Sequence, residues 1–214
     1  MEEQTPTGHR TRWLGMAMMA LGVSMIIVDA TIVNVALPSI IREFEIGLSD
    51  AEWINSIYSL VFAALLITLG KVGDMYGRRR MFMIGLVVFV AASMLAGLSN
   101  SGNSLIFARF LQGVGAAVIL PATLSTVNAT FRGRERGIAF GVWGSVIGGM
   151  AALGPLLGGW LTTEHSWRWA FYINVPIGLA ALIGAFLWVT ETRDTDLQRG
   201  FDVPGILLSG LGMA

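Results

Sequence analysis

The sequence contains no cysteine, only two histidines and few charged residues among its 214 positions. The absence of cysteine excludes disulfide bonds and thiolate metal sites. Charged residues make up 13% of the chain, about half of what a soluble domain carries, so water is not the main solvent of this protein. Because 14 basic residues balance 14 acidic ones, the chain has no overall field that would attract nucleic acid.

Groups that could carry out catalysis are equally scarce, so we do not expect an enzyme. The only candidate nucleophile and base are Ser145, which lies among glycines in an apolar stretch, and His165, which lies in a predicted loop. For these two side chains to meet in one catalytic site, the chain would have to fold back over a long distance. The glycines Gly113 and Gly115 do not form a dinucleotide-binding loop, because no strand precedes them.

What the sequence has in abundance is apolar residues, which make up 54% of the chain. They form six stretches of roughly 20 residues, the length of helix that crosses about 30 Å of hydrocarbon. The stretches lie near residues 14–36, 51–69, 81–98, 105–131, 138–161 and 169–189. The sequence therefore predicts an all-α membrane protein, with a six-helix transmembrane bundle over residues 14–190.

The segments outside this bundle are short. Residues 1–13 are predicted to form a cytoplasmic N-terminal tail, and residues 191–203 a cytoplasmic linker. A seventh apolar stretch starts at residue 204, and the chain stops at residue 214, after about half the length of a crossing. We interpret residues 204–214 as the truncated start of a seventh helix and the chain as a fragment or truncated product of a larger protein.

Most basic residues fall on one side of the predicted membrane. Since cytoplasmic loops of membrane proteins hold the excess of Lys and Arg, this side is predicted to be cytoplasmic, with the N-terminus there. The expected location is the plasma (inner) membrane, as a multi-pass protein. The opposite side holds only Arg42 and Arg168. The basic residues on the predicted cytoplasmic side are Arg10, Arg12, Lys71, Arg78, Arg79, Arg80, Arg132, Arg134, Arg136, Arg193 and Arg199.

Two charged residues lie inside the apolar stretches, Asp29 in the first and Arg109 in the fourth. A charge at this depth costs roughly 2.5 to 3.5 kcal/mol on insertion scales, so it normally faces a wet cavity or a partner. One interpretation is a proton or substrate relay. The alternatives are a structural hydrogen-bonding role between helices, or an Arg109 side chain that reaches the headgroups.

Other polar residues extend this candidate site. Gln112 lies at i+3 from Arg109, and small residues follow it on the same helical face, so this stripe is expected to line a cavity. Asn34 follows Asp29 by five positions, about 140° around an ideal helix. It shares the face of Asp29 only if Pro38 or local unwinding turns the end of the helix.

Residues 70–80 read GKVGDMYGRRR and connect the second and third apolar stretches. This segment strongly resembles the loop signature of the major facilitator superfamily, although Met75 stands where that signature usually has a basic residue. Its glycines permit close backbone approach and a tight turn, and its aspartate can lie near a helix N-terminus or pair with an arginine. The resemblance implies a cytoplasmic latch between two halves of a transporter, whereas the simpler interpretation is a basic turn. The latch residues would be Gly70, Asp74, Gly77, Arg78, Arg79 and Arg80.

Two further stretches resemble helix signatures of the same family. Residues 105–117 are similar to the signature whose arginine, here Arg109, is implicated in proton transfer. Residues 141–159 resemble the signature of antiporters, although Met150 stands where a glycine is typical. One helical face of this stretch is a stripe of small residues that we expect to mediate close helix packing, with a kink at the proline. The stripe consists of Gly141, Gly144, Gly148, Ala152, Pro155 and Gly159. Ordinary helix packing without antiport is the alternative. The positions that carry the antiporter resemblance are Gly141, Gly154, Pro155, Gly158 and Gly159.

Residues 29–38 and 167–178 narrow the resemblance to the fourteen-helix drug:proton antiporter branch, as its N-terminal half. The resemblance implies two inverted three-helix repeats, with Asp29 and Arg109 on equivalent helices that face a hydrated central cavity.

The implied function is proton-coupled export of small amphipathic or cationic compounds, in which a proton on Asp29 competes with the substrate. No cofactor is implied, since the proton gradient supplies the energy. The implied partners are the substrate, protons, membrane lipid and the missing C-terminal half, and not nucleic acid. The alternatives are a transport-inactive fragment, or a transporter of a metabolite, siderophore or lipid precursor.

Overall fold

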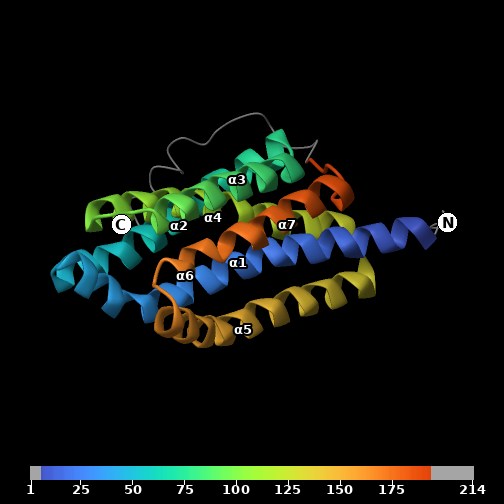
Figure 1. Ribbon diagram of the computed structural model, residues 1–214. Coiled ribbons are helices and arrows are strands. Elements are labelled where there is room, and N and C mark those ends of the chain that lie inside the picture. Colours follow the sequence, from blue (N-terminus) through green and yellow to red (C-terminus); the bar gives the residue numbers. More distant parts are fainter. Residues whose placement is uncertain (1–5, 194–214) are drawn as a thin grey trace.

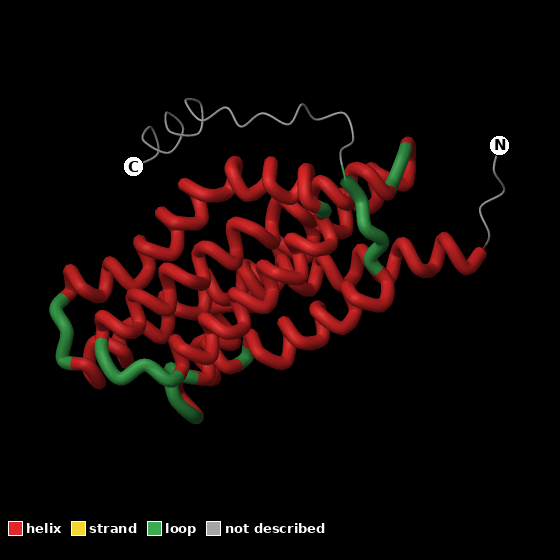
Figure 2. The backbone as a smooth tube through the Cα atoms, turned by 90° about the horizontal axis from the view of Figure 1, so that it is seen from above, coloured by secondary structure: helices red, strands yellow, loops and turns green. Residues whose placement is uncertain are grey.

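The computed structural model describes residues 6–193, and this part of the chain is helical with no strand (Figure 1). Short loops join the helices at the two ends of an elongated bundle (Figure 2). The predicted all-α fold class is therefore confirmed. The helices are α1 (Pro6–Phe44), α2 (Leu48–Tyr76), α3 (Arg78–Gly97), α4 (Gly102–Thr130), α5 (Gly133–Glu164), α6 (Trp169–Tyr172) and α7 (Asn174–Trp188).

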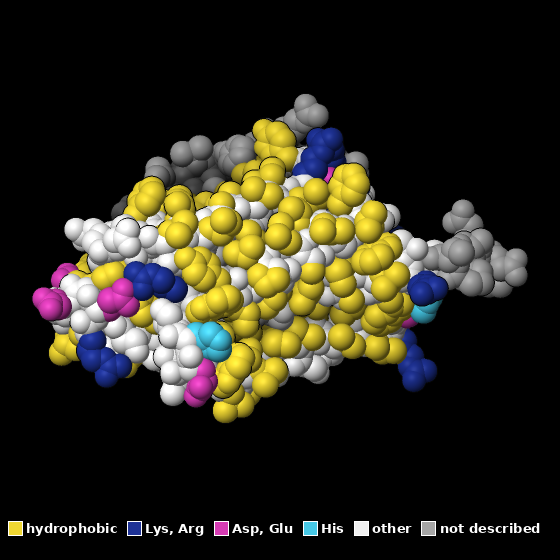
Figure 3. Space-filling model, viewed as in Figure 1, with side chains coloured by type: hydrophobic (Ala, Val, Ile, Leu, Met, Phe, Trp, Pro, Cys, Tyr) yellow, Lys and Arg dark blue, Asp and Glu magenta, His cyan; other side chains and the backbone are white. Residues whose placement is uncertain are grey.

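Six helical segments of the described chain are long and apolar enough to cross a membrane, and α6 and α7 together form the sixth. Apolar side chains cover the middle of the face seen in Figure 3, and charged side chains gather toward its ends. The end formed by the α2–α3 and α4–α5 connections, with residues 78–80 and 132–136, is called the arginine-rich end below.

Helices α1, α2 and α5 extend beyond the predicted apolar stretches at both ends. Helix α1 starts at Pro6, within the segment predicted as a tail, because its first turns have packing partners of their own. The Trp13 ring lies 4.9 Å from the Phe131 ring between centroids, and Arg12 lies 3.9 Å from the carboxylate of Glu135. The predicted start of a seventh helix, and the linker from residue 194 onward, lie outside the described residues.

The helix contacts repeat between the two halves of the bundle. Helix α1 packs on α5 and α7, α4 packs on α2 and α3, and α3 also packs on α7. In Figure 1, α5 lies beside α1 and apart from α2 and α3. If the first, second and third crossings are exchanged with the fourth, fifth and sixth, the same pairs of crossings remain in contact. Two inverted three-helix repeats require this symmetry.

Glycines set how closely the central helices approach one another. A Cβ atom on Gly115 of α4 would lie 2.9 Å from the backbone nitrogen of Phe89 and 3.0 Å from the carbonyl oxygen of Gly85, both on α3. On α5, Gly154 and Gly158 are buried, and a Cβ on either would meet α1. These contacts bring backbones together, as small residues do between membrane helices.

The small-residue stripe predicted to mediate close packing on α5 does not do so within the described chain. Its glycines would meet nothing within 4 Å if a Cβ atom were added, and Ala152 and Pro155 are exposed. The reason is geometric, since only one face of α5 touches α1, and that face carries Gly154 and Gly158. The glycines of the open stripe are Gly141, Gly144, Gly148 and Gly159.

Gly158→Leu is expected to destabilise the bundle by about 1–3 kcal/mol, since overpacking a tight contact costs this much. A Cβ at this position would lie 2.9 Å from Ile32 Cγ1 and 3.2 Å from Ile32 O, and the backbone oxygen cannot move aside. The thermal unfolding midpoint in detergent micelles measures the effect. The matched control is Gly159→Leu, the next residue, which meets nothing within 4 Å. Equal midpoints for the two variants would show that α1 and α5 do not pack as described.

Candidate functional site

The two charged residues inside the apolar stretches meet in the centre of the bundle. Arg109 Nη1 on α4 donates a hydrogen bond to Asp29 Oδ2 on α1, and the two form an ion pair. Arg109 Nε donates to the carbonyl oxygen of Ile54 on α2, at 3.2 Å. The side chains of Asp29 and Arg109 are 0% and 1% exposed, so the pair is fully desolvated.

Amide side chains complete the coordination of the carboxylate. Gln112 accepts from Arg109 Nη1 at 2.9 Å and donates to Asp29 Oδ1 at 3.0 Å. Asn174 of α7 donates to the same carboxylate oxygen at 2.8 Å. Both amides also donate to Ser93 Oγ of α3, at 2.8 and 3.3 Å.

We call these five side chains the buried polar cluster: Asp29, Ser93, Arg109, Gln112 and Asn174. The cluster joins α1, α3, α4 and α7, so one carboxylate holds together helices from both three-helix repeats. In this low-dielectric setting a buried carboxylate needs a nearby cation and hydrogen-bond donors, and Asp29 has Arg109, Gln112 and Asn174 around it. The Asp29 carboxylate is thus the acceptor that Arg109, Gln112 and Asn174 share.

The expectation of a hydrated chamber around this pair is wrong for the described state. The helices pack too closely, since a Cβ atom on Gly113 would lie 2.8 Å from the carbonyl oxygen of Tyr58. The Tyr58 ring covers the guanidinium, with Arg109 Cζ 4.2 Å from the ring centroid. Amide groups supply the hydrogen bonds that water would otherwise make. Arg109 also does not reach toward the headgroups, because its side chain is bound inside the bundle.

Asn34 lies apart from the cluster. Its side chain is exposed, accepts from Asn55 Nδ2 of α2 at 2.7 Å and donates to the Ala30 carbonyl oxygen at 3.1 Å. Helix α1 continues through Pro38, so nothing turns Asn34 onto the face of Asp29. The condition for Asn34 to share the face of Asp29 is therefore not met in this structure.

Sequence reasoning missed two members of the cluster, Ser93 and Asn174. Asn174 falls within residues 167–178, whose family resemblance was noted without a role for this side chain. Ser93 is a lone hydroxyl in an apolar stretch. The available signal was weak, since each is only a polar residue at membrane depth, where such residues normally face the bundle interior.

The segment predicted as a latch is a tight turn between α2 and α3. Gly77 has φ +119°, a conformation that favours glycine. Arg78 Nε donates to Asp74 Oδ1 at 2.6 Å across one turn. A Cβ on Gly70 would lie 3.2 Å from the ring of Pro121, so this glycine lets α2 approach α4 closely.

The same turn is tied to the end of α7 through Glu191, which sequence reasoning also missed. The Glu191 carboxylate accepts from the backbone nitrogens of Arg79 and Arg80, at 3.1 and 3.2 Å. A Cβ on Gly77 would lie 2.7 Å from Glu191 Oε1. The first turn of α3 therefore has a carboxylate cap that comes from more than 100 residues away in the chain. Arg80 itself is exposed.

Comparison with known proteins places this arrangement in context. A family model described as Major Facilitator Superfamily matches residues 19–207. The chain is 41% identical over 203 residues to the puromycin resistance protein of Streptomyces alboniger, covering 94% of this chain and 40% of that protein. It is 39% identical over 206 residues to the tetracenomycin C resistance and export protein of Streptomyces glaucescens, covering 95% of this chain and 38% of that protein.

The chain thus spans about two fifths of the length of these curated relatives. Among solved structures, it resembles a bacterial homologue of the human lysosomal transporter Spinster, in an inward-facing and unoccupied conformation. The TM-score is 0.69 at 20% identity, over 92% of this chain and 45% of that one. At this identity the likeness concerns the fold alone.

Proposed function

We propose, from the premise that this chain belongs to the major facilitator superfamily, that it supplies half of a proton-coupled exporter. The superfamily consists of transporters rather than enzymes, and the chain is a multi-pass membrane protein. The exported compounds are small and amphipathic or cationic. The arginine-rich end faces the cytoplasm, and the membrane is the plasma (inner) membrane. The names of the relatives, which refer to resistance and export, support transport out of the cell.

The buried polar cluster is the observation that carries this proposal. Asp29 is a titratable group that is 0% exposed and bound by Arg109, Gln112 and Asn174. A proton on this carboxylate removes its charge and leaves the arginine without a counter-ion, which a desolvated site cannot tolerate unchanged. Protonation of Asp29 is therefore coupled to the packing of α1 against α4, and helix packing is what must change between access states.

The closed cluster also sets the order of events. Since Asp29 is closed to solvent in this structure, it exchanges its proton only in a second state, in which α1 and α4 part. In that state a cationic substrate competes with the proton for the negative charge of Asp29, so that binding one expels the other. The turn at Asp74 and Arg78, tied to α7 through Glu191, holds the arginine-rich end together in the described state.

Transport by the complete protein tests the proposal. The full-length transporter that contains this chain is reconstituted in liposomes, and export of a cationic dye is followed after a pH gradient is imposed. We expect Asp29→Asn to lower gradient-driven export to the rate seen without a gradient, because the amide cannot carry a proton. The matched control is Asp50→Asn, an exposed acid at the start of α2, which should transport normally. Gradient-driven export that survives Asp29→Asn would refute the role of Asp29 in coupling.

A further inference from the structure

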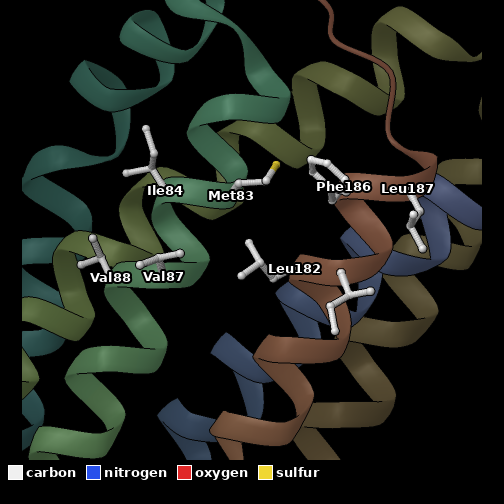
Figure 4. A pocket seen from close by; sticks show the side chains of 8 residues that line it. Met83, Ile84, Val87, Val88, Leu182, Phe186 and Leu187 are labelled. Carbon is white, nitrogen blue, oxygen red and sulfur yellow. The ribbon is translucent and has the colours of Figure 1, made fainter.

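The surface of the bundle carries an apolar groove between α3 and α7, with a volume of about 580 Å³ (Figure 4). Side chains from the two helices face each other across it, and all of them are apolar. The groove is on the outside of these helices, whose opposite faces contribute Ser93 and Asn174 to the buried polar cluster. The residues that shape it are Met83, Ile84, Val87, Leu182, Ile183 and Phe186.

The groove is open at the surface of the described bundle and is not enclosed in its interior. Ile84 and Val87 are 52% and 53% exposed, and Ile183 and Phe186 are 60% and 62% exposed. In a bilayer these side chains meet hydrocarbon. A hollow left empty there would lose dispersion contacts along its whole lining, so a flexible acyl chain is suited to fill it.

Cationic side chains stand at one end of the groove. Arg79 and Arg80 lie one helical turn before Met83 and Ile84 on α3, at the arginine-rich end. Arg79 Nη2 donates to the carbonyl oxygen of Phe186 at 2.7 Å, and its Cζ atom lies 5.4 Å from the Phe186 ring centroid. The guanidinium of Arg79 is therefore held beside a residue that lines the groove.

These two cations lack a carboxylate partner among the described residues, unlike Arg78, which pairs with Asp74. Glu191 is the nearby acid, but its oxygens bind the backbone nitrogens of Arg79 and Arg80 and not their guanidiniums. The Nε atom of Arg79 is buried and has no hydrogen-bond partner within the described part of the chain. Two guanidiniums that have no carboxylate partner in residues 6–193, at the end of an apolar groove, match an amphiphile with an anionic head and a hydrocarbon tail.

We infer that this groove is a binding site for an anionic phospholipid. One acyl chain lies between α3 and α7, and the phosphate is bound by Arg79 and Arg80, because guanidinium groups present paired donors that suit phosphate oxygens. The lipid belongs to the leaflet at the arginine-rich end. The site needs only that the chain spans a membrane, so it holds independently of the proposed transport activity.

Lipid retention tests this inference directly. The chain is reconstituted with equal amounts of phosphatidylglycerol and phosphatidylcholine, extracted in mild detergent, and examined by native mass spectrometry. We expect retained lipid to be mainly phosphatidylglycerol. Arg80→Ala should lower this preference about fivefold, and Arg79→Ala with Arg80→Ala should lower it further. Arg80→Ala is the safer variant, since the Arg80 side chain makes no hydrogen bond to a described residue.

Two further variants make the test specific. Arg132→Ala with Arg134→Ala removes two exposed arginines at the same end of the bundle and should keep the preference for phosphatidylglycerol. Ile183→Trp fills the groove and should reduce retention of both lipids. If both double variants lost the preference for phosphatidylglycerol equally, general surface charge would explain the retention. The proposed site would then be overturned. The proposed lipid site would also be overturned if Ile183→Trp retained as much lipid as the wild type. It would be overturned as well if this variant changed the oligomeric state of the chain and left lipid retention unchanged.

Discussion

Arg109→Met is expected to destabilise the folded bundle by about 3–5 kcal/mol, the cost of leaving a buried charge without its partner. Methionine fills much of the same volume, so the loss is electrostatic and not a matter of packing. Asp29 would keep its bonds to Gln112 and Asn174 but lose its only counter-charge, in a site that is 0% exposed. The carbonyl oxygen of Ile54 would lose its side-chain donor at the same time.

The control for this variant is an ion pair at the end of the bundle. Arg168 lies 2.6 Å from Glu43, and their side chains are 26% and 44% exposed. Removing such a partly solvated pair costs about 1 kcal/mol or less, so Arg168→Met should shift the unfolding transition much less. Unfolding in detergent, followed by circular dichroism, compares the two variants. Similar losses would mean that Asp29 and Arg109 do not form the buried pair described here.

The sequence predicted the fold because its main signals are long and redundant. Six apolar stretches, separated by charged loops, define the crossings, and the helices of the structure cover each of them. The motif at residues 70–80 and the helix signatures predicted the family, which the comparisons confirm. Helix ends were less predictable, because turns such as the one around Trp13 are stabilised by packing and not by membrane.

The centre of the site was predictable for a different reason. Apart from Glu52 at the edge of the second stretch, Asp29 and Arg109 are the only charges in the apolar stretches, and Gln112 lies one turn from Arg109 on the same face. The rest depends on how each helix is rotated about its axis, which helical spacing alone does not specify. Asn174 contacts Asp29 across 145 positions of the chain, and Asn34 turns away from it.

The unknown rotation of each helix about its axis also explains why the stripe predicted to pack on α5 was the wrong one. The spacing of small residues on α5 shows that two faces are smooth, one with Gly154 and Gly158 and one with Gly141 and Gly159. Which face touches α1 depends on the position of that helix in the bundle. The burial of the polar pair was also hidden from the sequence, because it depends on how far Gly113 lets α4 approach α2.

Combining Asp29→Asn with Arg109→Gln is expected to restore most of the stability that Arg109→Met removes. When both charged partners are replaced by neutral polar groups, no buried charge is left unpaired, and such double replacements are often nearly neutral. The amides of Gln112 and Asn174 donate to the same oxygen, Asp29 Oδ1, and an asparagine at position 29 keeps one such acceptor. The unfolding transition should therefore return to within about 1 kcal/mol of the wild type.

The full-length transporter with the same two substitutions should nevertheless fail to use a pH gradient, because a folded cluster without a titratable group cannot carry a proton. Stability and coupling would then separate in a single protein, which neither single variant achieves. Measuring dye export in liposomes alongside the unfolding transition gives both results. Restored stability with gradient-driven export would show that the buried pair is structural and that the proton travels elsewhere. Loss of both would mean that the ion pair itself, and not the packing around it, holds α1 to α4.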